Sequence, residues 1–156
     1  MANAKMNAKD AIFAALAECY VTIDGTRYNF MQAINLEARV TKTKVEVPIL
    51  GQTGKGHKAT GWNGEGNATF HFNTSMFSKI MERYKRTGED LYFDIQVTIN
   101  DPTSRAGSQT VILRYCNLDN VLLTKFDASA DYLDANLDFT FDDWEIVTPF
   151  EVLSGM

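Results

Sequence analysis

The side chains on which enzymes and metal centres depend are scarce in this chain of 156 residues. It has two cysteines, Cys19 and Cys116, and two histidines, His57 and His71, and their spacing matches no metal site. The cysteines are interpreted as buried or half-buried thiols of a reducing compartment. We therefore predict no metal site, no cofactor and no catalytic residues.

Several motifs are also missing. There is no Gly-x-Ser-x-Gly elbow for a nucleophilic serine. The glycines of residues 50–66 do not form a phosphate-binding loop, because Ile49 stands where a glycine would have to precede Gly54-Lys55. Paired carboxylates at 89–90 and 142–143 are more typical of solvated turns than of an acid–base pair. No apolar run is long enough for a membrane-spanning helix.

Basic residues are absent from the end of the chain. Residues 1–125 carry all 15 basic groups and 12 acidic groups, a net charge of +3. Residues 126–156 carry 8 acidic groups and no basic one, which brings the chain to its net charge of −5. Because phosphate binding needs lysine and arginine, this composition argues against a protein that grips nucleic acid.

The beginning of the chain resembles a secretion signal only superficially. Lys5 and Lys9 precede a short apolar stretch, and Ala15-Leu16-Ala17 resembles a signal-peptidase site. The stretch is at the lower limit of length and Asp10 adjoins it, so we predict an N-terminal arm over residues 1–18, mobile or docked. The rest divides into a domain at 19–150 and a C-terminal tail at 151–156.

Strand patterns dominate what the sequence does contain. Clean alternation of apolar and polar residues predicts half-buried strands at 93–99 and 133–141. Further strands are predicted at 19–23, 28–47, 67–72 and 110–123, the last one bent near Asn117, and Asp24-Gly25 is a hairpin turn pair. The six glycines of residues 50–66 predict a long loop.

One helix is predicted at residues 75–87. Apolar residues recur there at helical spacing from Met76 to Tyr84, and Gly88 is placed to end the helix. The fold class is therefore mainly β: an antiparallel β-sandwich or barrel-like sheet with one packed α-helix.

The order of these elements resembles one family. The run GHKATGWNGEGNATF at 56–70 is similar to the glycine-rich segment of tail-tube (core tail) proteins from contractile-tailed phages, defective prophages and phage-tail-like bacteriocins. In that family a helix follows that ends in a basic-aromatic stretch and a glycine, as residues 81–88 do here. The acidic closing segment has the pattern Phe-x-Phe and two acidic residues, as at 139–143. The resemblance covers about residues 19–150.

The resemblance implies a structural subunit of the tail-tube type, without catalysis and without a cofactor. Such subunits assemble into hexameric rings, which stack into a conduit for DNA inside a contractile sheath. The implied partners are other copies of the chain, the tail sheath protein, and tail terminator and baseplate proteins. DNA passes through without specific binding, and no membrane is involved. The implied location is the virion tail, after assembly in the host cytoplasm.

Two sets of residues are candidates for this function. The glycine-rich loop is expected to contact neighbouring subunits through Gly54, Lys55, His57, Lys58 and Trp62. Acidic residues on polar strand faces are expected to line the lumen and to repel DNA. These are Asp94, Asp134, Asp138 and Asp142. The alternative function is a ligand- or carbohydrate-binding β-sandwich module, in which Trp62 stacks on a sugar ring.

Overall fold

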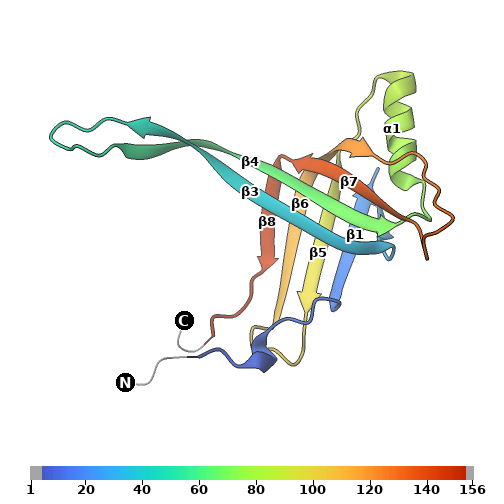
Figure 1. Cartoon of the computed structure of the whole chain (residues 1–156), viewed down its shortest axis with the longest axis horizontal. Coiled ribbons are helices and arrows are strands. Elements are labelled where there is room, and N and C mark those ends of the chain that lie inside the picture. The colour runs from blue at the N-terminus through green and yellow to red at the C-terminus, as the bar shows by residue number, and fades with distance from the viewer. Residues whose placement is uncertain (1–4, 154–156) are drawn as a thin grey trace.

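The strands form two antiparallel sheets that share one long strand (Figure 1). The structure is a computed structural model that describes residues 5–153. Sheet A has the strand order β2-β1-β5-β6-β8, and sheet B has the order β6-β7-β4-β3. The elements in chain order are a 3-10 turn at Ala8–Asp10, β1 (Ala17–Ile23), β2 (Thr26–Asn29), β3 (Ala33–Val47), β4 (Gly56–His71), α1 (Met76–Thr87), β5 (Phe93–Asn100), β6 (Ser108–Val121), β7 (Asp134–Phe141) and β8 (Asp143–Thr148). The predicted fold class is confirmed.

Strand β6 joins the two sheets because it bends in the middle. Its first part pairs with β5 and β8 in sheet A, and residues 117–121 pair with β7 in sheet B. At the bend, Tyr115 has a φ of 55°, and its N–H donates to Asp94 Oδ1 at 3.3 Å. The extra residue at this bulge changes the direction of the strand, as β-bulges do. The predicted strand and its bend near Asn117 are confirmed, with the bend centred on Tyr115.

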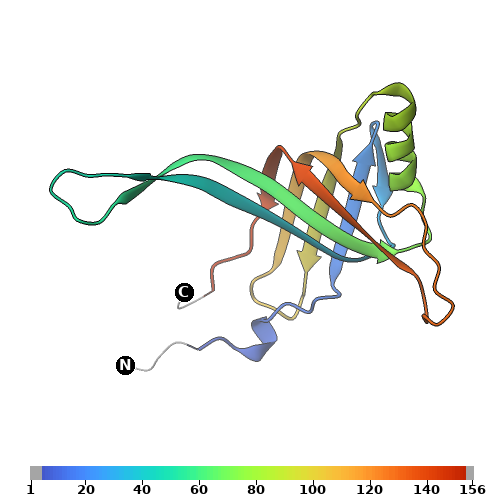
Figure 2. The ribbon, with the colours of Figure 1, turned by 45° about the horizontal axis from the view of Figure 1, so that its top comes forward.

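The turn and the helix predicted from local sequence are both confirmed. Asp24 and Gly25 have φ values of 51° and 79°, as a two-residue turn with two positive φ angles requires. Helix α1 ends at Gly88, which has a φ of 74° and donates its N–H to Tyr84 O at 2.9 Å. The helix covers one end of the sandwich (Figure 2).

A cluster of phenylalanine rings holds the helix on the sheets. Phe77 of α1 meets Phe30, Phe70 and Phe93, with ring centroids 5.4–6.1 Å apart. Ile80, one turn further along the helix, is also buried. Tilted aromatic pairs of this kind add to the free energy of simple burial. The apolar stripe of the helix therefore belongs to the core of its own subunit.

The glycine-rich segment is mostly a strand, which corrects the predicted loop at 50–66. The loop ends at Lys55, and β4 occupies residues 56–71. Gly64 and Gly66 pair with Phe141 and Phe139 of β7, whose rings lie on the glycine backbone. A Cβ atom on Gly66 would lie 2.5 Å from Phe139 Cζ and 2.7 Å from Glu37 O. These glycines make room for buried rings and do not make the chain flexible.

Strand β8 was missed by the sequence analysis, which ended the domain's strands at residue 141. Only Asp142 separates β7 from β8, so no turn signal marks the boundary. The chain leaves sheet B at Phe141 and pairs with β6 in sheet A from Asp143 onward. The acidic pair 142–143 thus lies at a corner between the two sheets and not at the end of the fold.

The N-terminal arm is docked on its own domain where the structure describes it. The Asp10 side chain is fully buried. Its Oδ2 atom accepts hydrogen bonds from Arg105 Nη2 at 2.7 Å and from Arg105 Nε at 3.0 Å. Ser104 Oγ donates to Asp10 O at 2.8 Å, and Phe13 N–H donates to Asp101 Oδ2 at 3.0 Å. Residues 1–4 of the predicted arm and 154–156 of the predicted tail lie outside the described residues.

We expect Gly66→Ala to lower the free energy of unfolding by roughly 1–3 kcal/mol, because the added methyl group overpacks against Phe139. Gly61→Ala is the matched control, since a Cβ there meets no atom within 4 Å. Denaturant unfolding of the two purified variants measures the difference. Equal stabilities would show that the β4–β7 packing tolerates a side chain at residue 66.

We expect Asp10→Asn to lower the midpoint of thermal unfolding at neutral pH. The hydrogen bonds from Arg105 hold the pKa of Asp10 below its ordinary value of 3.8. A depressed pKa contributes stability at pH values above 3.8, and this stability is lost as the pH falls below 3.8 through the folded-state pKa. The wild type should therefore converge on the variant in acid. Exposed Asp131→Asn is the control, and an unchanged midpoint for Asp10→Asn at pH 7 would contradict the role of this ion pair.

Candidate functional site

The first candidate surface is the side of sheet B that faces away from the core. Buried residues such as Leu137 and Phe139 alternate along β7 with exposed polar ones, and β4 follows the same alternation. We call this surface the polar face. It carries carboxylate, amide and hydroxyl groups with one guanidinium and one imidazole: Asn35, Glu37, Arg39, Glu65, Asn67, Thr69, His71, Asn120, Asp134, Asn136, Asp138 and Thr140.

Strand register arranges the polar face in rows. Glu37, Asn67, Asp138 and Asn120 are cross-strand partners in one row over four strands. Arg39, Glu65 and Thr140 form the next row. A hollow of about 360 Å³ lies over both rows, and Asp119 adds another carboxylate to its lining. The face is therefore hydrophilic and carries more negative than positive charge.

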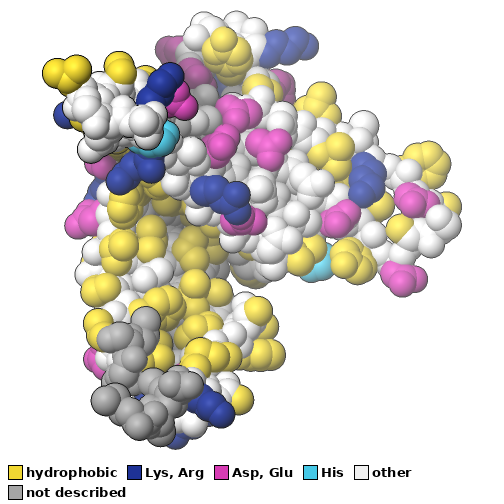
Figure 3. Space-filling view, turned by 60° about the vertical axis from the view of Figure 1, so that its left-hand side comes forward, with side chains coloured by type: hydrophobic (Ala, Val, Ile, Leu, Met, Phe, Trp, Pro, Cys, Tyr) yellow, Lys and Arg dark blue, Asp and Glu magenta, His cyan; other side chains and the backbone are white. Residues whose placement is uncertain are grey.

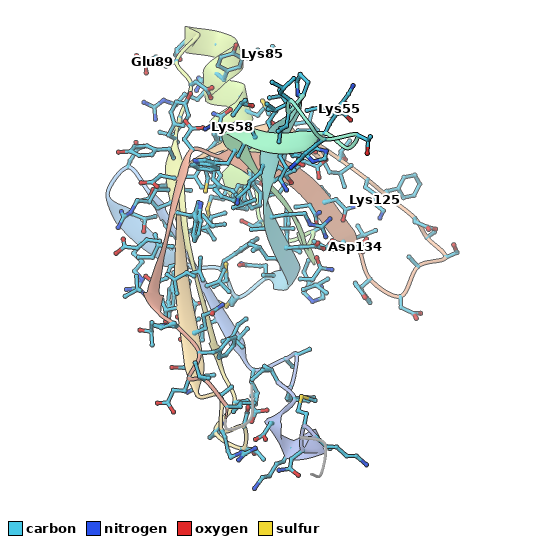
Figure 4. The ribbon with its side chains drawn as sticks, turned by 90° about the vertical axis from the view of Figure 1, so that its left-hand side faces the viewer. Lys55, Lys58, Lys85, Glu89, Lys125 and Asp134 are labelled. Atoms are coloured by element: carbon cyan, nitrogen blue, oxygen red, sulfur yellow. The ribbon has the colours of Figure 1, made fainter. Side chains whose placement is uncertain are left out.

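Three carboxylates of the polar face accept hydrogen bonds from neighbouring side chains. Lys125 Nζ donates to Asp134 Oδ1 at 2.9 Å, and this hydrogen bond lowers the pKa of Asp134. Asn120 Nδ2 donates to Asp138 Oδ2 at 2.8 Å, and Arg39 Nη2 to Glu37 Oε1 at 2.7 Å. Figure 4 labels Lys125 and Asp134 on this side of the molecule.

The four acidic residues predicted for the lumen do not share one surface. The structure places Asp134 and Asp138 together on the polar face. Asp94 lies on β5 in sheet A, 3.9 Å from Arg114, and belongs to a different surface. Asp142 lies at the corner after β7, where its N–H donates to Arg114 O, so the alternation that grouped it with Asp138 ends one residue earlier.

Two further carboxylates of the polar face, Glu37 and Glu65, were missed. Glu65 was assigned to a loop because of its glycine neighbours, although it alternates with buried Gly64 and half-buried Gly66. Glu37 stands between Leu36 and Ala38 in a stretch where apolar and polar residues alternate. This alternation could have placed Glu37 on a polar strand face from the sequence alone.

The second candidate surface is the long hairpin of β3 and β4. Strand β4 pairs with β7 only from Gly64 to His71, so the strand residues between 41 and 63 pair only with each other. We call residues 41–63 the arm, and it projects far from the sandwich in Figures 1 and 2. It carries four lysines and one glutamate, together with exposed Val45, Val47, Leu50 and Trp62.

The residues predicted for contacts between subunits are all on this arm. Gly54 and Lys55 lie in the turn at its tip, and Lys55 Nζ is 3.6 Å from Glu46 Oε2. His57, Lys58 and Trp62 are on β4, where they pair with Glu46, Val45 and Lys42 of β3. Figure 4 shows Lys55 and Lys58 on the hairpin.

The two thiols belong to neither surface: Cys19 is half-buried and Cys116 is buried. Burial raises the pKa of the Cys19 thiol to about 11 and that of Cys116 to about 12, so neither thiol ionises near neutral pH. Across residues 5–153 there is no group of three or more histidine, cysteine or acidic side chains that could hold a metal ion. No helix in the same part of the chain has the length and apolar character needed to cross a membrane.

Comparison with known proteins relates this fold to phage tails. The phage tail tube protein family matches residues 4–148. Protein XkdM of the phage-like element PBSX of Bacillus subtilis (strain 168) is 39% identical over 110 residues, 70% of this chain and 75% of that protein.

Two solved structures have the same fold at low sequence identity. A chain of the six-fold symmetrised baseplate of the anti-feeding prophage superposes with a TM-score of 0.67 at 12% identity, over 88% of this chain and 95% of that one. A chain of the extended sheath–tube complex of an extracellular contractile injection system superposes with a TM-score of 0.61 at 12% identity, over 89% and 93%. The sequence resemblance is confirmed: this chain is a structural protein that belongs to the phage tail tube protein family.

Proposed function

We propose that this chain builds a hollow tube of stacked hexameric rings, through which DNA passes inside a contractile sheath. The observation that carries the proposal is the arm, which extends beyond the domain without any contact that would hold it there. Membership of the tail tube family supports assembly into a tube, and the arm is long enough to contact another subunit.

The arm needs a partner for physical reasons. A two-stranded ribbon in water is at best marginally stable. This ribbon exposes Val45, Val47 and Leu50 and leaves the outer edge of β3 unpaired. An unpaired edge is a template for another chain. When one surface of a subunit binds a different surface of the next copy, the series of contacts either closes into a ring or continues as a filament. A tube of stacked rings uses both outcomes.

The polar face supports the second part of the proposal, a conduit that does not hold DNA. Its four carboxylates outnumber its two cationic side chains, Arg39 and the Lys125 that pairs with Asp134. The remaining side chains are amides, hydroxyls and one histidine. A wall with negative potential repels the phosphates of DNA, and a wall without lysine clusters releases few counterions. We propose that the polar face lines the lumen. Asp94 and Asp142 lie away from it and are not part of the proposed wall.

The proposed partners follow from the assemblies in which similar folds occur. One similar chain belongs to a baseplate with six-fold symmetry and another to a sheath–tube complex. We accordingly propose homo-hexameric rings that contact a sheath, a tail terminator and a baseplate, without catalysis, in a virion tail assembled in the host cytoplasm. No particular observation favours the carbohydrate-binding alternative, because Trp62 lies on a projecting ribbon opposite Lys42.

We expect a shortened arm to prevent tube formation without unfolding the domain. Residues 45–58 are replaced by Asn-Gly, which closes the ribbon on the pair Lys44 and Ala59 with a two-residue turn. Negative-stain electron microscopy should show rings and tubes for the wild type and none for the variant, at equal thermal stability. Tubes from the shortened chain, or a wild type that stays monomeric at high concentration, would contradict the proposal.

We expect Asp138→Lys to convert the tube into one that retains DNA. Each ring would gain lysines on the proposed wall, and the retention should weaken as salt rises from about 50 to about 200 mM, because released counterions drive phosphate binding. Cosedimentation of assembled tubes with short duplex DNA measures this. Glu82→Lys on exposed α1 is the matched control. Equal retention by both variants would exclude Asp138 from the wall.

A further inference from the structure

The two sheets leave an apolar opening on the side of the arm. Two cavities of about 780 and 170 Å³ lie between sheet A and strand β3, and both are lined by Leu36, Val97 and Ile99. The smaller one extends to Val111 and Leu113 of β6. Ile146 and Trp144 of β8 are the cross-strand partners of those two residues, so they continue the same face.

We call this surface the apolar wedge, formed by Leu36, Ala38, Val40, Val97, Ile99, Val111, Trp144 and Ile146. Figure 3 shows hydrophobic side chains gathered along sheet A below the arm. Trp144 and Ile146 are 40% and 47% exposed in the single chain. Exposed apolar side chains gathered in one patch are typical of an interaction site.

The loop between β6 and β7 carries a matching set of apolar side chains. Among residues 122–133, Phe126 is 89% exposed, Leu123 is 71% exposed and Tyr132 is 62% exposed. Figures 1 and 2 show this loop at the opposite end of the long axis from the arm. Opposite placement of two complementary surfaces is the geometry that a head-to-tail ring requires.

Hydrogen bonds at the base of the loop and within it favour the conformation that it has in the single chain. The ion pair of Lys125 and Asp134 closes its base at 2.9 Å. Within it, Asp127 Oδ1 accepts hydrogen bonds from Ser129 N–H at 3.0 Å and from Ser129 Oγ at 2.7 Å. A preorganised loop loses little conformational entropy on docking, so its apolar contacts contribute more fully to affinity.

Charge favours the same pairing. The arm beside the apolar wedge carries Lys42, Lys44, Lys55 and Lys58 against the single acidic Glu46. The loop carries Asp127 and Asp131 near its tip, and its single lysine, Lys125, is paired with Asp134 at its base. Opposite charges around an apolar contact steer the encounter and fix its orientation.

We propose that the 122–133 loop of one copy inserts Phe126 and Leu123 into the apolar wedge of the next copy, beside its basic arm. The inference rests on the proposed function, because it names the contact that closes the ring. The ring contact is then distinct from whatever the tip of the arm binds.

Photo-crosslinking tests this contact directly. A benzophenone amino acid is placed at residue 126, and this chain is co-assembled with an excess of ¹⁵N-labelled wild type. We expect crosslinks to peptides of the apolar wedge in β3, β5, β6 or β8, carrying the label that marks a second copy. The same amino acid at exposed Tyr84 of α1 is the control. Crosslinks only to other parts of the neighbour would overturn the inference.

A substitution pair separates this inference from the proposed function. Phe126→Asp should abolish rings and tubes in electron micrographs while leaving the thermal midpoint unchanged, because residue 126 contributes little to its own core. Val152→Asp, at a residue 84% exposed, should assemble normally. If Phe126→Asp assembles like the wild type, the loop contact is wrong and the tube proposal stands. If the wild type forms neither rings nor tubes, the proposed function itself fails.

Discussion

The packing of two phenylalanine rings on two glycines is the interaction on which the rest of this structure depends. Phe139 and Phe141 of β7 lie directly on the backbone of β4 at Gly66 and Gly64. This contact fixes the register of β4, because a shift by one residue would bring side chains under the rings. The register then sets the rows of the polar face and the point at which β4 leaves the domain. The arm therefore begins where the glycine–phenylalanine packing ends.

The open side of the sandwich gives the molecule its second constraint. Strand β6 bends at Tyr115 and ties the two sheets together, while β8 forms an edge of sheet A and β3 an edge of sheet B. Apolar side chains such as Ile146 and Val40 remain exposed between these edges. A stable monomer would have to cover this surface itself, whereas a subunit of an assembly leaves it for its neighbour. The proposed ring contact would cover this surface.

Local signals predicted the elements that local physics determines, namely the Asp24-Gly25 turn, the helix with its glycine end, and the alternation that places Asp134 and Asp138 on one face. Only the second part of strand β4 was predicted, at residues 67–72. Residues 56–66 were assigned to a loop, because glycines disfavour strands and the rings that explain them belong to β7, far along the chain. Asp142 was misassigned because β7 ends one residue before it. The apolar wedge is formed by separate strands, and no single stretch of sequence reveals it.

We propose above all that sheet B forms the inner wall of a tube. A cryo-electron microscopy map of tubes assembled from the purified wild-type chain tests it most directly, at a resolution that places side chains. The account predicts six copies per ring, with Asp138 and Glu65 pointing into the lumen and no apolar side chain on its wall. A map in which the polar face lies on the outside of the tube, or in which sheet A lines the channel, would contradict it.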